Sequence, residues 1–262
     1  MSETLKPVRI PDFAEKKRRG EKISVLTAYD ATMARLIDRG GVDAILVGDS
    51  LGTVIMGCDT TLEVTMDMMV HHTRSVSKGV KHAAIIADLP FGSYQASIVD
   101  AVRNASRLLA EGHAAAVKLE GGRAMVETVA RLVDVGIPVM GHLGLTPQSI
   151  HKLGGNKKIA ASESERLMED AKALEKAGAF SIVLEMIPTE AAKAITEAIG
   201  IPTIGIGAGP HCDGQVLVSY DAFGLFEEFV PSFVKQYAKL GEAMVKATAE
   251  YTAEVRDGRF PK

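Results

Sequence analysis

The sequence is poor in cysteine, in long apolar runs and in net charge. Its two cysteines, Cys58 and Cys212, lie far apart, so a reducing cytosol is the simpler expectation, although a single disulfide stays open. No stretch approaches the roughly 18–20 apolar residues that span a bilayer, and residues 1–22 lack the apolar core of a secretory signal. The net charge of −3 gives no reason to expect nucleic-acid or membrane binding. We therefore expect a cytoplasmic protein with neither kind of partner.

The chain also lacks any Pro/Ser-rich linker or low-complexity run that would divide it. Its composition, 47% hydrophobic and 24% charged, is that of an ordinary globular protein. A chain of 262 residues could hold two domains, but β/α barrels reach this length as one domain. We expect residues 1–262 to form a single domain.

A repeating unit runs through the sequence: a short run of Val, Ile and Leu, then polar or glycine residues, then a helical pattern. Apolar runs of this kind are typical of parallel strands that are buried on both faces. The predicted strands are Ser24–Tyr29, Asp43–Gly48, Ala83–Ala87, Ala115–Leu119, Pro138–His142, Ser181–Leu184, Pro202–Ile206 and Gln215–Ser219. The predicted helices between them are Ala31–Arg39, Thr65–Lys78, Ile98–Glu111, Arg123–Val135, Glu163–Lys176 and Glu190–Ala198.

Eight strands that alternate with helices over this length predict an α/β fold, a (β/α)8 TIM barrel. A doubly wound open sheet is the alternative. The barrel would carry helical extensions at both its N-terminal and C-terminal ends, with one or two helices between Pro231 and Lys262. Ser162 and Glu165 have the spacing of a capping box, which predicts that a helix begins at this point.

Ionisable residues close almost every predicted strand, and in such barrels the chemistry lies at the carboxyl ends of the strands. The acids are Asp49, Asp88, Glu120 and Glu185, and the nearby bases are Lys118 and His142. Buried carboxylates are costly unless they are paired or bind a cation. Because the acids outnumber the bases, the cluster favours a hard divalent cation, and carboxylate and water ligands suit Mg²⁺.

Each of these residues also has a simpler structural explanation. An aspartate after a strand is often only the N-cap of the next helix, and this is our prediction for Asp30. A cap or a surface position is likewise the alternative for the clustered acids. Lys118 could be a snorkelling surface lysine, although strand alternation places it on the same face as Glu120. His142 is explained equally well as a hydrogen-bonded core histidine.

Other candidate motifs favour no separate site. The glycine-rich run from Gly205 to Gly209 lacks the spacing of a dinucleotide fingerprint, so we interpret it as a close backbone approach in the barrel mouth, with phosphate binding as the alternative. His71 and His72 are adjacent on a predicted helix and do not share a face, which argues against joint metal ligation. The histidines and cysteines show no zinc-ligand spacing.

Between Ser24 and Gly224 the sequence contains, in order, LTAYD, LVGDSLG, ADLPFGSY, VKLEGG, GHLGLTPQS, PTIGIGAG, DGQVLV and DAFG. Together these motifs resemble the 3-methyl-2-oxobutanoate (ketopantoate) hydroxymethyltransferase family of the phosphoenolpyruvate/pyruvate barrel superfamily. The resemblance implies a Mg²⁺-dependent transfer of a hydroxymethyl group from 5,10-methylenetetrahydrofolate to a 2-oxo acid through an enolate. The product would be 2-dehydropantoate, in pantothenate and coenzyme A biosynthesis. A homo-oligomer, commonly a decamer, is also implied.

The resemblance assigns roles to the acids and bases at the strand ends. Asp49 and Asp88 would hold Mg²⁺, directly or through water, with Glu120 beside them as a further metal residue. The oxo acid would be bound by Asp49, Ser50, Asp88, Lys118 and His142. Glu185 would accept the proton from the carbon beside the ketone. One position departs from the family pattern: Glu63 stands where a proline is expected, which affects loop shape rather than the acid cluster.

Two other classes of function stay open. A lyase or mutase of the same superfamily would also use Mg²⁺ and an enolate, but its cysteine-bearing KKCGH-like loop has no counterpart here. A non-catalytic binding barrel would have no need of so many acids. The loop Thr146–Ala160 contains paired glycines and the lysines Lys152, Lys157 and Lys158, which could meet the glutamate tail of a folate. A solvated loop is the alternative.

Overall fold

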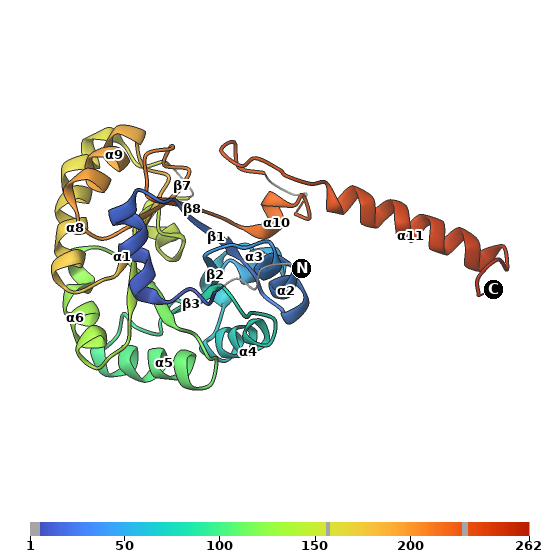
Figure 1. Cartoon of the computed structure of the whole chain (residues 1–262), viewed down its shortest axis with the longest axis horizontal. Helices are drawn as coiled ribbons and strands as arrows, with labels where there is room; N and C mark the ends of the chain where they lie inside the picture. The colour runs from blue at the N-terminus through green and yellow to red at the C-terminus, as the bar shows by residue number, and fades with distance from the viewer. Residues whose placement is uncertain (1–5, 156–157, 227–229, 262) are drawn as a thin grey trace. The chain divides into compact units, whose positions relative to one another are not determined.

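The computed structural model describes residues 6–155, 158–226 and 230–261. Its eight parallel strands close into a barrel in sequence order (Figure 1). The strands are β1 (Ile23–Thr27), β2 (Ala44–Val47), β3 (Ala84–Asp88), β4 (Ala116–Glu120), β5 (Val139–Gly144), β6 (Ser181–Glu185), β7 (Thr203–Ile206) and β8 (Gly214–Leu217). The ends of each predicted strand differ from the observed ends by at most two residues. The TIM barrel is confirmed and the open sheet is wrong.

A helix follows each of the first six strands and covers the outside of the barrel (Figure 1). These helices are α2 (Ala31–Arg39), α4 (Met66–Ser77), α5 (Ile98–Ala110), α6 (Val126–Asp134), α8 (Ser164–Lys176) and α9 (Thr189–Ala198). Shorter turns are α3 (Leu51–Val54), α7 (Ile150–Leu153), η1 (Thr61–Glu63), η2 (Arg123–Met125), η3 (Pro147–Ser149) and η4 (Ala161–Glu163). The predicted N-cap is confirmed, because the Asp30 carboxylate accepts the backbone N–H groups of Thr32 and Met33 at 2.8 and 2.9 Å.

The predicted capping box is wrong. Ser162 lies inside η4, and α8 begins at Ser164 after Glu163, which makes no side-chain cap. The 3-10 turn moves the first residue of α8 to Ser164, so Ser162 does not occupy the N-cap position that the box requires.

The helix α1 (Ile10–Arg19) precedes the barrel and supplies the N-terminal extension. Its Phe13 is fully buried and packs edge-on against Phe180, with ring centroids 5.3 Å apart. Phe13 belongs to the same core cluster as Ile23, the first residue of β1, and Phe180 directly precedes β6. The amino end of the barrel is thus filled by apolar side chains, which leaves the carboxyl end for chemistry.

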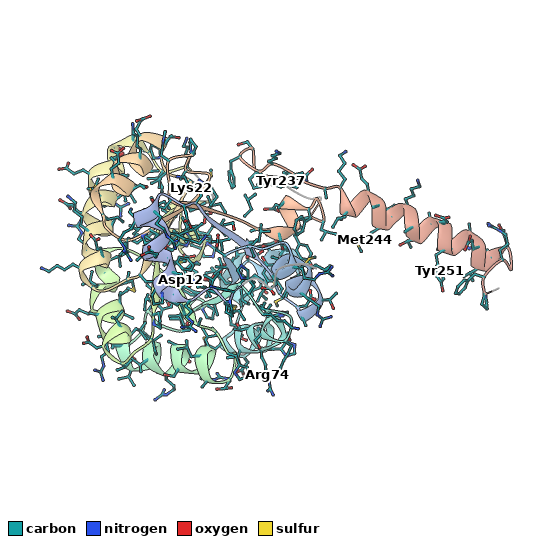
Figure 2. All side chains as sticks on the ribbon, viewed as in Figure 1. Asp12, Lys22, Arg74, Tyr237, Met244 and Tyr251 are labelled. Carbon is teal, nitrogen blue, oxygen red and sulfur yellow. The ribbon has the colours of Figure 1, made fainter. Side chains whose placement is uncertain are left out.

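The chain divides into two compact units, residues 1–216 and residues 217–262. The second unit contains α10 (Ser219–Ala222) and the helix α11 (Leu240–Arg256), which is the one helix found in the described part of Pro231–Lys262. Met244 and Tyr251 stand out from α11 and are 61% and 56% exposed (Figure 2). The single domain over residues 1–262 stays a prediction.

Cys58 and Cys212 are both free thiols. Within the described ranges, no helix combines the length and the apolar character needed to cross a membrane.

Candidate active site

Four of the predicted site residues are neighbours at the carboxyl ends of adjacent strands. Asp88 of β3 is paired in register with Lys118 of β4, and Glu120 of β4 is paired with His142 of β5. Lys118 and Glu120 are two residues apart, so they face the same side of the strand. Lys118 is only 4% exposed, which makes the surface-lysine alternative wrong.

Asp49 and Ser50 lie in the turn that leads from β2 into α3. The Asp49 backbone N–H donates to Asp88 Oδ2 at 3.1 Å, and the Ser50 hydroxyl lies 2.8 Å from the Tyr29 hydroxyl. A Cβ on the preceding Gly48 would lie 2.7 Å from Ser50 Oγ and 3.6 Å from Asp88 Oδ2. Glycine at position 48 therefore leaves room for these two side chains.

His142 lies between two glutamates and a lysine. Its Nδ1 is 3.2 Å from Lys118 Nζ and 3.6 Å from Glu120 Oε1, and its Nε2 is 3.2 Å from Glu185 Oε2. Burial and Lys118 lower the pKa of His142, but the two glutamates outweigh them and raise it to about 9. The shorter Lys118 contact instead requires a neutral ring, because an ammonium group can only donate. In both protonation states the Nε2 proton faces Glu185.

Glu185 ends β6, and its side chain is 17% exposed, against 3% for those of Asp88 and Glu120. Met186 follows with φ of +52°, a conformation that is uncommon for residues with a side chain. Gly144 on β5, the register partner of Glu185, has φ of +99°, and a Cβ there would clash with the Glu185 carbonyl oxygen. The backbone at Glu185 is tightly constrained while its carboxylate reaches toward the mouth.

Gln148 and Tyr94 complete the cluster and were missed as site residues in the sequence. The Gln148 amide nitrogen donates to Asp49 Oδ2 at 2.9 Å, and its backbone N–H donates to Glu120 Oε2 at 3.0 Å. The Tyr94 hydroxyl donates to Gln148 Oε1 at 2.8 Å and accepts the Glu120 N–H at 3.1 Å. Tyr94 lies in the motif ADLPFGSY and Gln148 in the motif GHLGLTPQS. Neither tyrosine nor glutamine is a residue type that by itself indicates metal binding or acid–base chemistry.

The acids of the cluster are not equivalent. Burial, then the charges of Asp88 and Glu120, raise the pKa of Asp49 to about 8. Burial also raises the pKa of Asp88, although Lys118 opposes it. Burial raises the pKa of Glu120 too, but His142, Lys118 and the Gln148 N–H outweigh it and leave the pKa below its usual value. Burial lowers the pKa of Lys118, yet its acidic neighbours outweigh burial and raise it. Of the three buried carboxylates, Asp49 is thus the one whose charged form the surroundings disfavour most at neutral pH, and a nearby cation would favour it.

Unmatched polar atoms concentrate in the same cluster. In the described part of the chain, four buried side-chain nitrogen or oxygen atoms have no hydrogen-bond partner of good geometry, and three of them are Asp88 Oδ1, Glu120 Oε1 and His142 Nε2. Asp88 Oδ1 does lie 3.1 Å from Lys118 Nζ, a charge contact rather than an aligned hydrogen bond. Buried polar atoms left in this way indicate that a ligand or ion completes the site.

The donor set fits a cation that takes few protein ligands. Among the described residues, no three His, Cys, Asp or Glu side chains converge into a metal cage. Asp49 and Asp88 remain as two adjacent carboxylates, and Mg²⁺ typically takes one or two carboxylates and keeps several waters. The residues present therefore fit Mg²⁺ held by this pair. Glu120 is engaged by His142 and Gln148, and its role as a metal residue stays a prediction.

Comparisons with known proteins show the family of the chain. The sequence model of the ketopantoate hydroxymethyltransferase family matches residues 7–262. The chain is 56% identical over 256 residues to the 3-methyl-2-oxobutanoate hydroxymethyltransferase of Moorella thermoacetica, covering 97% of this chain and 95% of that protein. It is 53% identical over 262 residues to the enzyme of that name from Pelobacter propionicus, covering 100% and 97%. The chain belongs to the ketopantoate hydroxymethyltransferase family. It is thus an enzyme of the hydroxymethyltransferase class, as the motifs predicted.

Solved structures of other enzymes share the fold of the family. Phosphonopyruvate hydrolase in complex with oxalate and Mg²⁺ aligns with a TM-score of 0.65 at 13% identity, covering 96% of this chain and 88% of that one. A 2,3-dimethylmalate lyase of the phosphoenolpyruvate mutase/isocitrate lyase superfamily aligns with a TM-score of 0.61 at 17% identity, covering 95% and 88%. At this identity the likeness establishes the barrel fold alone.

The structure thus brings the predicted residues Asp49, Ser50, Asp88, Lys118, Glu120, His142 and Glu185 to one end of the barrel through the contacts above. Their individual roles toward substrate and metal stay predictions. Lys157 lies outside the described residues, whereas Lys152 and Lys158 are exposed. Glu63 ends the turn η1.

Proposed function

We propose that the chain transfers a hydroxymethyl group from 5,10-methylenetetrahydrofolate to 3-methyl-2-oxobutanoate and gives 2-dehydropantoate, with Mg²⁺ as the metal. The observation that carries the proposal is the set of unmatched buried atoms on Asp88, Glu120 and His142, beside carboxylates that outnumber the available cations. Names of relatives that are more than half identical support the reaction class. The pathway would be pantothenate and coenzyme A biosynthesis.

Asp49 and Asp88 would hold the Mg²⁺, and Lys118 would lie beside the bound oxo acid. When bound, Mg²⁺ supplies a Lewis acid that stabilises negative charge on the keto oxygen. Lys118 is buried 3.1 Å from Asp88 Oδ1, so its ammonium group is fixed where the acid's carboxylate or enolate would need a positive charge. Ser50, held by Tyr29, offers a hydroxyl at the same edge.

Glu185 is the proposed proton acceptor. Its carboxylate is the most open of the acids, and His142 Nε2 lies 3.2 Å from its Oε2, a charge contact rather than an aligned hydrogen bond, while the other oxygen is left for substrate. The proton leaves the carbon beside the ketone for Glu185, and that carbon then attacks the methylene carbon of the folate donor, whose bond to one folate nitrogen has opened. Water replaces the second folate nitrogen on the methylene carbon, and tetrahydrofolate leaves with one proton from water and the proton that Glu185 took up. Water contributes the hydroxyl group of the product.

The reaction is tested with 3-methyl-2-oxobutanoate and a ¹³C-methylene folate donor, followed by ¹³C NMR with Mg²⁺ and with chelator. We expect label in the hydroxymethyl carbon of 2-dehydropantoate with Mg²⁺ and none with chelator. Cleavage of an oxo-acid or phosphonate substrate without label transfer would contradict the proposal in favour of the lyase or mutase. At present that alternative rests on fold likeness at 13–17% identity.

We also propose that the chain forms a homo-oligomer, with a decamer as the family expectation. The helix α11 has no buried residue and exposes Leu240, Met244, Val245, Tyr251 and Val255. Exposed apolar side chains in such a row favour burial against another surface. Sedimentation velocity should give a multiple of the 27.9 kDa chain. A single species of chain mass at micromolar concentration would overturn this proposal.

A further inference from the structure

The Gln148 side chain is fully hydrogen-bonded within the acid cluster, although the residue lies in a loop. It is 6% exposed and lies in η3, after β5, rather than on a strand. Its amide nitrogen donates to Asp49 Oδ2 at 2.9 Å and to the Leu89 carbonyl oxygen at 3.0 Å. Its amide oxygen accepts from the Tyr94 hydroxyl at 2.8 Å and from Gln95 Nε2 at 3.0 Å.

These partners determine which way the amide points. The Leu89 carbonyl oxygen can only accept, as can Asp49 Oδ2 when that carboxylate is ionised to hold a cation, so the nitrogen must face them. A flipped amide would place its oxygen against these two acceptors and its nitrogen against the donating Gln95 amide. Both donors and both acceptor positions of the side chain are used, which leaves Gln148 one orientation in the folded protein.

The same residue reaches the second carboxylate through its backbone. The Gln148 N–H donates to Glu120 Oε2 at 3.0 Å, so one residue holds an oxygen of each acid. With Oδ2 bound to the amide, the Asp49 carboxylate cannot rotate without breaking that hydrogen bond. The segment after β5 is in this way fixed to the turns after β2 and β3 and to the end of β4.

We propose that Gln148 is a positioning residue that orients Asp49 for a divalent cation, an inference that rests on the cation site of the proposed function. Hydrogen-bond partners of metal-binding carboxylates orient their ligands, and their loss typically weakens metal binding or activity by about 10- to 100-fold. The loop after β5 thereby takes part in building the metal site, although none of its side chains need touch the metal.

The test uses Gln148→Met, which removes both halves of the amide at similar length, and Gln148→Asn, which keeps the amide but withdraws it by one methylene, about 1.5 Å. The matched control is Gln215→Met, because the exposed Gln215 donates its amide nitrogen to the Gly209 carbonyl oxygen at 3.0 Å. Each full-length protein is titrated with Mg²⁺ alone, and with Mn²⁺ alone, by calorimetry. Its thermal midpoint is measured with chelator and with saturating metal.

We expect both Gln148 variants to bind Mg²⁺ about 10- to 100-fold more weakly than the parent and the control. The metal-induced rise in their thermal midpoint should shrink accordingly, since that rise follows the ratio of metal concentration to Kd. A purely structural role would lower the midpoint equally with and without metal and leave Kd unchanged, and that result overturns the proposal. If Gln148→Met does not fold, unchanged metal binding by Gln148→Asn overturns it equally.

A parent protein that binds neither Mg²⁺ nor Mn²⁺ also overturns the inference, whatever the product assay gives. Weakened metal binding by the variants of a parent that makes no 2-dehydropantoate would leave the inference standing and remove the proposed function. The two failures are therefore distinguishable.

Discussion

Asp43 and Asp49 flank the same strand, β2, and their surroundings are opposite in kind. Asp43 has Lys16 Nζ at 2.7 Å and accepts the backbone N–H and the hydroxyl of Ser24 at 2.8 and 3.0 Å. Burial raises the pKa of Asp43, but Lys16 and Ser24 outweigh it, so the pKa lies below its usual value. At the other end, burial and two neighbouring carboxylates raise the pKa of Asp49 to about 8.

The contrast extends to other acids at the two ends of the barrel. At the amino end, Asp213 pairs with Lys17 at 2.9 Å, and Asp38 accepts the backbone N–H groups of Lys81, His82 and Ala83. At the carboxyl end, acids face one another across Lys118 and His142. The acids at the amino end have their charges matched within the fold, whereas those at the carboxyl end are matched only in part, which favours a cation or substrate beside them.

The largest expected effect is the loss of the proposed base. Glu185→Gln keeps the size of the side chain but cannot accept the proton, so kcat should fall by about 10²- to 10⁴-fold. Mg²⁺ binding should be retained, because Asp49 and Asp88 are unchanged. Steady-state kinetics and calorimetry on the same preparation check both statements, and near-normal turnover would assign the base to another residue.

Substitution of His142 should have a smaller effect in the same direction. His142→Gln loses the contact of Nε2 with Glu185 Oε2 at 3.2 Å, so the base is less well oriented. We expect kcat to fall by about 10- to 100-fold, as for other residues that orient a functional group. The kinetics of the double variant with Glu185→Gln provide the control. A further full loss from His142→Gln in that background would show that it acts independently of Glu185.

The two aspartates flanking β2 should respond in opposite ways to amide substitution in metal-free protein. Asp43→Asn loses the attraction of Lys16 and should cost about 1–3 kcal/mol of unfolding free energy at pH 7. It should leave Mg²⁺ binding unchanged. Asp49→Asn should abolish Mg²⁺ binding and should not destabilise the metal-free protein at pH 8, where it removes a charge that burial disfavours.

The contributions of Asp49 and Asp43 to the free energy of unfolding should change with pH in opposite directions. The pKa of Asp49 lies near 8 in the fold against 3.8 ordinarily, so the folded state holds a proton that the unfolded state releases. Its contribution to stability therefore falls as pH rises from about 4 to 8. The pKa of Asp43 is lowered, so its contribution is full above pH 4 and is lost as pH falls below that value. Urea unfolding in chelator from pH 3 to 8 checks both, and the same pH trend in the two variants would contradict this comparison.

The smallest expected effect concerns the loop after β5. Neutralising Lys152, Lys157 and Lys158 together should raise the KM for a polyglutamylated folate donor by a few fold, because exposed charge pairs are each worth about 0.2–1 kcal/mol. The KM for the monoglutamate donor should not change. Equal KM values for the polyglutamylated donor in parent and variant would identify these lysines as solvent-facing only.

The barrel could be predicted because its strands are buried on both faces and appear as separate apolar runs. The acids at the strand ends could be predicted for the same reason, since each run ends at a charge. Glu185 shows how far this extends: its position was predicted, but not its contact with His142, which depends on the register of β5 and β6.

The loop residues of the site could not be predicted in the same way. Gln148 is a neutral amide in a 3-10 turn, and only the closed barrel brings it to Asp49, ninety-nine residues away along the chain. The Ser162 capping box failed because local spacing does not reveal that a 3-10 turn precedes the helix and moves its N-cap to Glu163. Elements set by a regular burial pattern were thus predictable, whereas contacts made across loops were not.

The central claim is that the unbalanced acids at the carboxyl end, with Mg²⁺, form an enolate from 3-methyl-2-oxobutanoate. It is tested most directly by proton exchange at C3 of this acid in D₂O, followed by NMR with Mg²⁺ and with chelator, before any folate is added. We predict exchange that requires both Mg²⁺ and Glu185 and that turns into 2-dehydropantoate formation when methylenetetrahydrofolate is added. Absence of exchange with Mg²⁺ present, with or without the folate, would contradict the claim.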